Sequence, residues 1–299
     1  MPLWSFKKKQ ETERTLEIHQ SFYLSVLAVP GGLPTILQIV NPDGSNSALK
    51  GFGVPLAQGA SKDLLNQQIA LGAYALTTPD KLTIIQMTVS SISDVEGFQL
   101  PSNQRDLEAT DLIGEKYERA RKATHIISLF FKGYNPDALA SVEFLLGIAS
   151  RIGKLTNGVV ADIMAESYRL PEELRISDRL DPRVDFREIA TIKAIRLGDG
   201  VWVSTRGLSK FNLPEYEMYG IPDDLVDTAF KMLVAAGQQT LLGVPLRAGE
   251  SAYSVQYPME IAEGKKQRDA WGDRATLEIS DPNKQSAKIG VQSWKDQGN

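Results

Sequence analysis

Cysteine is absent from the 299-residue sequence, and histidine occurs only twice, as His19 and His125. Without cysteine the chain can form no disulfide, no thiolate metal site and no cysteine nucleophile, a composition typical of a reducing compartment. A helix with two zinc-binding histidines is excluded, and His125 shares one face of a predicted strand with Ile127 and Leu129. We therefore expect no metal site, no cofactor and no histidine-based catalysis.

Long apolar runs are also missing. Residues 22–29 form an apolar stretch, but Ser25 interrupts it and Pro30 ends it, whereas a membrane helix needs about 20 apolar residues. The lysines near the start are followed by polar residues rather than by the apolar core of a secretion signal. These features predict a cytoplasmic protein that neither spans a membrane nor is secreted.

The sequence has no excess of positive charge. Lysine and arginine number 33 against 37 aspartates and glutamates, which gives a net charge of -4 with the signs mixed along the chain. Proteins that bind nucleic acid usually carry a basic stripe that neutralises phosphates. We therefore expect no nucleic-acid partner.

Standard catalytic and phosphate-binding motifs do not occur: there is no phosphate loop, no G-x-G-x-x-G after a strand and no G-x-S-x-G. Ser47 and Lys50 have the spacing of a serine–lysine pair, but they lie in a polar turn region. Four acids recur at spacings typical of one helix face: Glu108, Asp111, Glu115 and Glu118. Basic residues interleave with them: Lys116, Arg119 and Arg121. This balance predicts a solvated helix face rather than a row of metal ligands.

Hydrophobic periodicity predicts an α+β fold with a mixed, mostly antiparallel sheet and helices packed on it. Predicted strands cover residues 22–29, 83–89, 125–131, 158–164, 186–197, 201–205, 253–261 and 276–279. Predicted helices cover residues 61–75, 103–123, 135–152 and 222–236. The Gly-Asp-Gly sequence at 198–200 joins two of the strands as a β-hairpin, because these residues tolerate a left-handed backbone.

These elements predict two α+β halves that meet near residues 104–122. A polar N-terminal segment covers residues 1–20, and the two halves cover 21–122 and 123–280. The last segment, 281–299, is predicted to be a partly mobile tail. Within the second half, the strand 253–261 alternates apolar and polar residues and contains Pro258, which favours a sheet edge that could pair in a homo-oligomer.

One short sequence occurs twice, at residues 53–56 and again at 243–246, where it reads Gly-Val-Pro-Leu in both copies. Duplication of an ancestral half would explain the repeat. Convergence of two loops on the same proline and glycine turn chemistry is the favoured explanation, because a helix is predicted after one copy and a strand after the other.

Residues 202–217 form the most distinctive run of the chain, with the sequence Trp-Val-Ser-Thr-Arg-Gly-Leu-Ser-Lys-Phe-Asn-Leu-Pro-Glu-Tyr-Glu. In a structural interpretation, Gly207 lets the chain leave a strand sharply and Pro214 stiffens its return. Phe211 and Leu213 would then fill the core.

A functional interpretation of the same run assigns four candidate binding residues: Trp202, Arg206, Glu215 and Glu217. Two glutamates at a spacing of two project to the same face of an extended segment. With an arginine nearby they would face a groove and bind a partner or a ligand, and paired carboxylates can also serve hydrolysis.

The run resembles the signature T-x-G-L-x-x-F-G-x-P-E-x-E of an uncharacterised bacterial family classed among the domains of unknown function. The matching residues are Thr205, Gly207, Leu208, Phe211, Pro214, Glu215 and Glu217. Asn212 stands where the family has glycine, and asparagine also permits a left-handed backbone. The resemblance extends over residues 123–261 and implies no particular activity.

The four residues Thr205, Gly207, Leu208 and Ser209 are also similar to an element of suppressor-of-fused-like domains, which act mainly as protein-binding modules. This resemblance and the missing catalytic motifs favour a bacterial cytoplasmic protein-interaction or regulatory module, immunity-like roles included, over an enzyme. The alternative is a small-molecule-binding protein or a carboxylate-dependent hydrolase centred on Arg206, Glu215 and Glu217.

Overall fold

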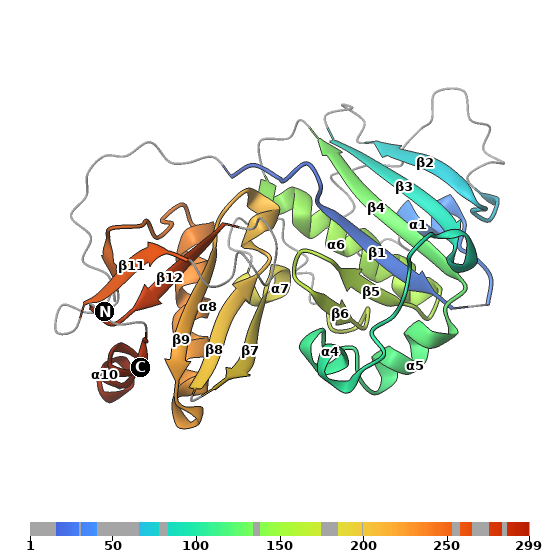
Figure 1. Ribbon diagram of the computed structural model, residues 1–299. Coiled ribbons are helices and arrows are strands. Elements are labelled where there is room, and N and C mark those ends of the chain that lie inside the picture. The colour runs from blue at the N-terminus through green and yellow to red at the C-terminus, as the bar shows by residue number, and fades with distance from the viewer. Residues whose placement is uncertain are drawn as a thin grey trace. The chain divides into compact units, whose positions relative to one another are not determined.

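The computed structural model describes residues 16–29, 31–40, 66–77, 83–133, 138–174, 185–198, 200–252, 258–264, 275–282 and 286–298 (Figure 1). The chain divides into two compact units, one formed by Ile18–Val184 and the other by Asp185–Asn299 together with Met1–Glu17. Each unit contains a six-stranded, mostly antiparallel sheet with helices packed on it. The predicted α+β fold class is therefore confirmed.

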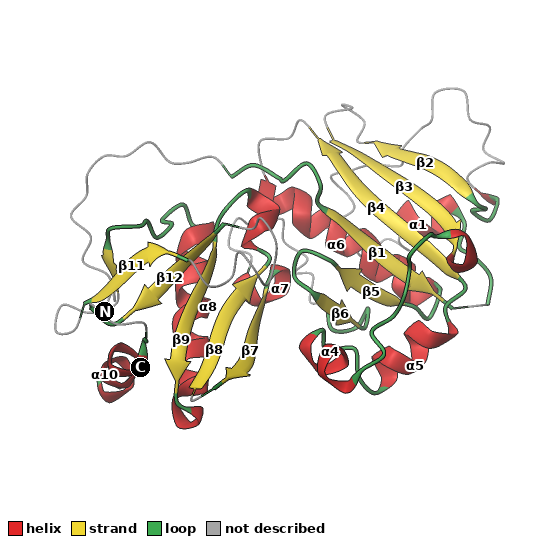
Figure 2. Ribbon diagram, in the orientation of Figure 1, coloured by secondary structure: helices red, strands yellow, loops and turns green. Residues whose placement is uncertain are grey.

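The first unit is built on a sheet with the strand order β2-β3-β4-β1-β5-β6. Its strands are β1 (Tyr23–Ala28), β2 (Gly72–Thr77), β3 (Thr83–Ser91), β4 (His125–Gly133), β5 (Val159–Asp162) and β6 (Ser167–Arg169). All neighbours pair antiparallel. Helix α6 (Ala138–Leu155) packs against β1, β4 and β5, and the short α1 (Ile36–Val40) packs against α6 (Figure 2).

Part of the opposite face of this sheet is covered by polar helices. These are α4 (Gln104–Ala109) and α5 (Glu115–Lys122), which follow the 3₁₀ turn η1 (Ile92–Asp94). A buried cluster beneath them contains Leu27, Leu112, Ala120, Ile126 and Val159. These helices, polar on their outer side, thus still contribute apolar side chains to the core.

The second unit is built on a sheet with the strand order β10-β11-β12-β9-β8-β7. Its strands are β7 (Thr191–Leu197), β8 (Gly200–Arg206), β9 (Glu215–Ile221), β10 (Ser251–Ala252), β11 (Met259–Glu263) and β12 (Thr276–Ser280). Only β12 and β9 pair parallel. Its helical elements are α7 (Phe186–Ile189), η2 (Leu208–Phe211), η3 (Asp223–Leu225), α8 (Val226–Leu241) and α10 (Lys288–Asp296). Helix α8 packs on β8 and β9, and α10 packs on α8.

The division of the chain differs from the predicted one. A boundary at residues 122 and 123 would separate β4 from β1 and β3, but β4 pairs with both of these strands along its length. The observed division falls between Val184 and Asp185. Within the segment predicted as a tail, residues 288–296 form the helix α10, whose Trp294 is buried.

Three predicted elements need correction. The helix expected at 61–75 is not formed at its end, where residues 72–77 form β2; residues 61–65 lie outside the described part of the chain. The strand expected from residue 186 begins at Thr191, because Asp185 caps the short helix α7 by accepting a hydrogen bond from the Arg187 amide. The long helix at 103–123 is two helices, separated by a turn in which Asp111 has a φ of 55°.

The edge strand predicted at 253–261 is also different. Strand β11 begins at Met259, which lies opposite Ala252 of β10, while Glu260 lies opposite both Ser251 of β10 and Ser280 of β12. Residues 253–257 lie outside the described part, as do Ser47, Lys50 and the first copy of the repeated sequence at 53–56. Strand β11 is therefore an inner strand of the second sheet where it is described.

None of the helices in the described ranges is both long and apolar enough to cross a lipid bilayer.

Candidate functional site

The distinctive run 202–217 forms the end of β8, the turn η2 and the start of β9. Gly207 has a φ of 123° and its position leaves no space for a side chain, since a Cβ would lie 3.0 Å from the Ala190 Cα. Asn212 ends η2 with a φ of 56°, so it adopts the left-handed backbone that asparagine tolerates. Leu208 and Phe211 are buried beneath the turn.

Glu215 holds this turn together from the inside. One carboxylate oxygen, Oε2, accepts a hydrogen bond from the Thr205 hydroxyl at 2.8 Å. The other, Oε1, accepts from the amides of Gly207 at 2.8 Å and Ser209 at 3.0 Å. The side chain is 1% exposed. Glu215 therefore positions the backbone of η2 and does not face solvent.

The remaining three candidate residues, Trp202, Arg206 and Glu217, gather in one buried cluster. The guanidinium carbon of Arg206 lies 5.2 Å from the centre of the Trp202 ring, and Trp202 stacks on Tyr219 with ring centres 6.0 Å apart. The Tyr219 hydroxyl donates to Glu217 Oε2 at 2.8 Å. Burial, and then the hydrogen bond to the Glu217 carboxylate, raise the pKa of the Tyr219 phenol.

This cluster lies on the sheet face opposite α8. The Tyr216 hydroxyl is 2.6 Å from the Thr240 hydroxyl of α8, which places Tyr216 on the α8 side of β9. Because successive strand residues project to opposite faces, Glu217 projects away from α8. Arg206 and Glu217 are 1% and 0% exposed. The cluster is thus a buried, charged layer of the second sheet.

Two buried residues of this region were not assigned by the sequence patterns. Lys210 is fully buried in η2, and its ammonium group donates to the Ile189 carbonyl just before β7. Tyr219 completes the cluster of Trp202 and Glu217. Its spacing of two from Glu217 was the signal that could have identified it, because both residues then share one face of an extended strand.

The histidines lie in local contacts. His19 accepts a hydrogen bond from the Ser21 amide, and His125 bonds the hydroxyl of its neighbour Thr124. Within the described ranges, no group of three or more histidine, cysteine, aspartate or glutamate residues is placed to hold a metal ion.

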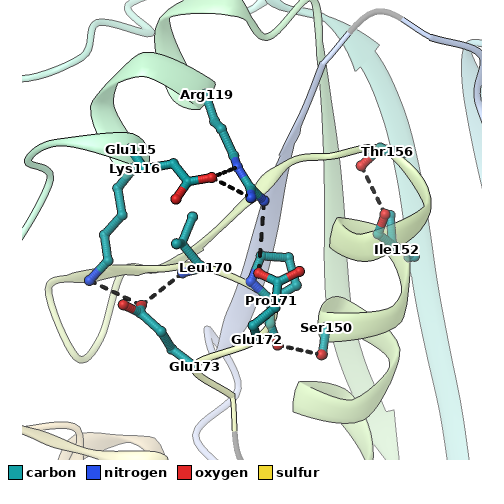
Figure 3. Close-up of polar contacts among 10 residues, drawn as sticks. All are labelled: Glu115, Lys116, Arg119, Ser150, Ile152, Thr156, Leu170, Pro171, Glu172 and Glu173. Carbon is teal, nitrogen blue, oxygen red and sulfur yellow. Dashed lines mark hydrogen bonds and ion pairs between the residues drawn. The ribbon is translucent and has the colours of Figure 1, made fainter.

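Lys116 and Arg119 form ion pairs with acids of the row 108–118 and of the segment after β6, and Figure 3 draws those of Glu115, Glu172 and Glu173. Glu108 instead accepts a hydrogen bond from the Gln104 side chain. Lys116 lies 2.5 Å from Asp111 and 3.0 Å from Glu173, and Glu173 also accepts from the Leu170 amide. Arg119 lies 2.6 Å from Glu115. The Lys116–Glu173 pair, with Arg119 3.8 Å from Glu172, ties α5 to the segment after β6. The acids and bases are thus paired as the sequence predicts, but they do not share one solvated helix face, because a turn at Asp111 separates α4 from α5 and Lys116 is buried.

Replacing Lys116 with methionine is expected to lower the free energy of unfolding by about 1 kcal/mol. The ammonium group is mostly buried but both partner carboxylates are about half exposed, so solvent screens much of the attraction. Urea unfolding would measure the loss. Lys122→Met, in the last turn of the same helix and exposed, is the matched control and should change stability by less than about 0.5 kcal/mol. Equal stabilities of the two variants would contradict the role of Lys116.

The outer edge of β2 is one of the two edges of the first sheet. β2 pairs with β3 over all six residues, and in the described ranges no strand pairs with its other edge. Gly72, Ala73 and Ala75 are exposed, and Leu71 just before the strand is 57% exposed. No charged residue occurs between positions 66 and 77. Among the described residues the edge is thus unpaired, and its strand carries no charge.

The residues just before β2 are held in place by a side chain of the strand itself. The Tyr74 hydroxyl accepts from the Ala70 amide at 2.7 Å and donates to the Ala70 carbonyl at 3.0 Å. On the inner side, Leu76 is buried against the sheet core. These contacts attach the residues just before β2 to the strand itself, beside its antiparallel partner β3.

No family model, no curated protein and no solved structure matches this chain. The resemblance of residues 202–217 to the family of unknown function and to suppressor-of-fused-like domains therefore stays a prediction.

Proposed function

We propose that the protein is a protein-interaction module of regulatory type, which binds an extended segment of a protein along the open edge of β2. The observation that carries the proposal is the exposed, uncharged edge of this strand. The missing cysteines and the resemblance of residues 202–217 extend the proposal to a protein of the bacterial cytoplasm.

An open strand edge presents backbone N–H and C=O groups that another strand can pair with. Proteins usually block such edges with lysine, proline, a bulge or a covering element. The six residues of β2 include no charge and no proline, and its register with β3 contains no bulge. Strand addition of this kind gives affinity through main-chain hydrogen bonds and selectivity through alternate side chains.

The alternative, a ligand-binding protein or carboxylate-dependent hydrolase centred on Arg206, Glu215 and Glu217, has weaker support. A hydrolase needs two carboxylates that reach a substrate from either side of the scissile bond. Both oxygens of Glu215 accept hydrogen bonds from its own turn, and Arg206 and Glu217 are almost fully buried. These contacts favour a stabilising role for the run 202–217.

Selection from a phage-displayed library of random peptides tests the proposal. The wild-type protein is expected to enrich extended peptides that bind about tenfold more weakly to the variant Ala73→Lys/Ala75→Lys, because lysines on an edge strand oppose pairing. The matched control, Gln86→Lys/Thr88→Lys, puts the same charges opposite these positions on β3. It should bind the peptides like the wild type.

Two results would contradict the proposal. One is a selection that enriches no peptide on protein held at a dilution at which sedimentation velocity shows it to be monomeric, so that a second copy does not occupy the edge. The other is a set of peptides that bind the wild type, the β2 variant and the β3 control with equal affinity, since such peptides would bind elsewhere than at the edge of β2.

A further inference from the structure

We infer that the segment bound at the edge of β2 is β2 of a second copy of this chain, so that two first-unit sheets join edge to edge in a symmetric dimer. This inference rests on the proposed use of the β2 edge and names its partner. Three features of β2 carry it: the match of its two faces under two-fold symmetry, its lack of charge and the apolar surface beside it.

Two-fold antiparallel pairing suits the alternation of this strand. A symmetric pair centred on one residue keeps each side chain on the same sheet face as its partner in the other copy. Centred on Tyr74, it places Ala73 opposite Ala75 of the second copy on the exposed face. On the inner face it places Gly72 opposite Leu76 of the second copy. Small residues thus meet small residues on the exposed face. On the inner face the bulky Leu76 meets a glycine, and the two Tyr74 rings meet at the centre of the pair.

Charge favours a self-complementary contact at this edge. The whole chain carries a net charge of -4, so two copies repel each other on average. Like charges directly opposite each other in a strand pair are destabilising. Because β2 and the residues just before it are uncharged, two copies can pair here without placing like charges opposite each other.

Apolar surface beside the edge adds a driving force. Leu71 is 57% exposed, the largest exposure among the large hydrophobic side chains of the described residues. Tyr74 is half-buried on the inner face. Pairing of two edges would remove apolar surface at both copies of these residues from water, which stabilises association roughly in proportion to the area.

Charge-swap variants test the inference by sedimentation velocity over a wide range of concentration. The wild type is expected to dimerise. Ala73→Lys/Ala75→Lys and Ala73→Glu/Ala75→Glu are each expected to dimerise at least about tenfold more weakly, because like charges would then lie opposite each other. An equimolar mixture of the two variants should regain a dimer, since opposite charges now meet. Circular dichroism confirms that each variant is folded.

Glu260→Lys on β11 is the control and should leave the dimer unchanged. Glu260 is exposed and lies between β10 and β12. It belongs to the segment 253–261, which the sequence predicts as the edge that pairs between copies. Loss of the dimer in this variant alone would overturn the inference.

Two further outcomes separate the inference from the proposed function. A wild type that stays monomeric at every concentration overturns the second-copy inference, while peptides that depend on the β2 edge would still support an interaction module with another partner. A dimer that both charge variants retain separately places the contact elsewhere and also overturns the inference.

Discussion

Glu215→Ala is expected to lower the free energy of unfolding by about 3 kcal/mol. The substitution removes the only side chain that the structure shows accepting hydrogen bonds from the Thr205 hydroxyl, the Gly207 amide and the Ser209 amide. A buried donor left without an acceptor costs about 1 to 3 kcal/mol. Three such donors would together cost about 3 to 9 kcal/mol. Backbone shifts and entering water would recover part of this loss, so we expect a value at the lower end of the range.

Urea unfolding followed by circular dichroism measures this change. Glu215→Gln keeps one carbonyl oxygen for the two amides, so it should lose less than half as much stability as Glu215→Ala. Glu250→Ala, an exposed glutamate of the same unit, is the matched control and should change stability by less than about 0.5 kcal/mol. If Glu215→Ala were as stable as Glu250→Ala, the carboxylate would not hold the turn, and a binding role for Glu215 would gain support.

The hydrogen bonds of Glu215 explain why the run 202–217 is so distinctive in sequence. A sharp exit at Gly207, a one-turn helix and a left-handed Asn212 leave several amides that no strand partner can satisfy. One buried carboxylate serves two of them. The run thus forms the connection between β8 and β9. The Lys210 ammonium group also attaches this connection to the chain just before β7, by donating to the Ile189 carbonyl.

Local sequence patterns predicted many elements well, because each depends on residues close in sequence. The short apolar runs at 22–29 and 125–131 correspond to β1 and β4, and the glycines at 198 and 200 lie at the β7–β8 hairpin. The turn chemistry of a hairpin is local, and its register follows from the turn. These predictions therefore needed no knowledge of the rest of the chain.

The division into units could not be predicted in the same way. It depends on β1 pairing with β4, which places Tyr23 opposite Phe130 across about a hundred residues of chain. A polar stretch such as 104–122 looks like a linker in sequence. Here it covers part of the sheet face with α4 and α5, which bury Leu112 and Ala120 beneath them. The stretch is polar because one side of its helices is exposed, and it does not mark a boundary between the two units.

The candidate binding residues show a related limit. A spacing of two correctly indicates a shared strand face only where the strand is regular, and Glu215 stands at the very start of β9, where its oxygens turn to η2. Trp202, Arg206 and Glu217 do gather. Burial is what the pattern could not reveal, since charged residues are almost never fully buried unless paired. The charges of Arg206 and Glu217 had therefore favoured a groove that faces solvent over a buried cluster.

The helices predicted at 135–152 and 222–236 end just before Gly153 and Gly237, but both glycines lie inside their helices, α6 and α8. Each is instead required by packing. A Cβ at Gly153 would lie 2.5 Å from the Pro171 ring, and one at Gly237 would overlap the buried ring of Phe186. The second contact joins α8 to α7 and so anchors the chain just before β7.

Gly237→Ala is therefore expected to destabilise the protein by about 2 to 3 kcal/mol. Alanine favours a helix over glycine by about 1 kcal/mol, but an added methyl group in a packed core costs about 1 to 3 kcal/mol and more where the neighbour cannot move. Phe186 is fully buried, and its amide is held by the Gln238 side chain at 2.8 Å. Steric overlap should thus outweigh the helix preference.

A double-mutant cycle tests this explanation by urea unfolding. Phe186→Leu alone should destabilise the protein through the cavity that it leaves, by about 1 to 3 kcal/mol. Combined with Gly237→Ala, it should cost clearly less than the sum of the two single changes, because the new methyl group would occupy the space of the removed ring. Additive losses, or a Gly237→Ala variant more stable than the wild type, would show that the glycine is not needed for the contact between α8 and Phe186. A combined loss smaller than the sum would establish that close packing requires this glycine. A sequence pattern cannot distinguish that constraint from a helix end.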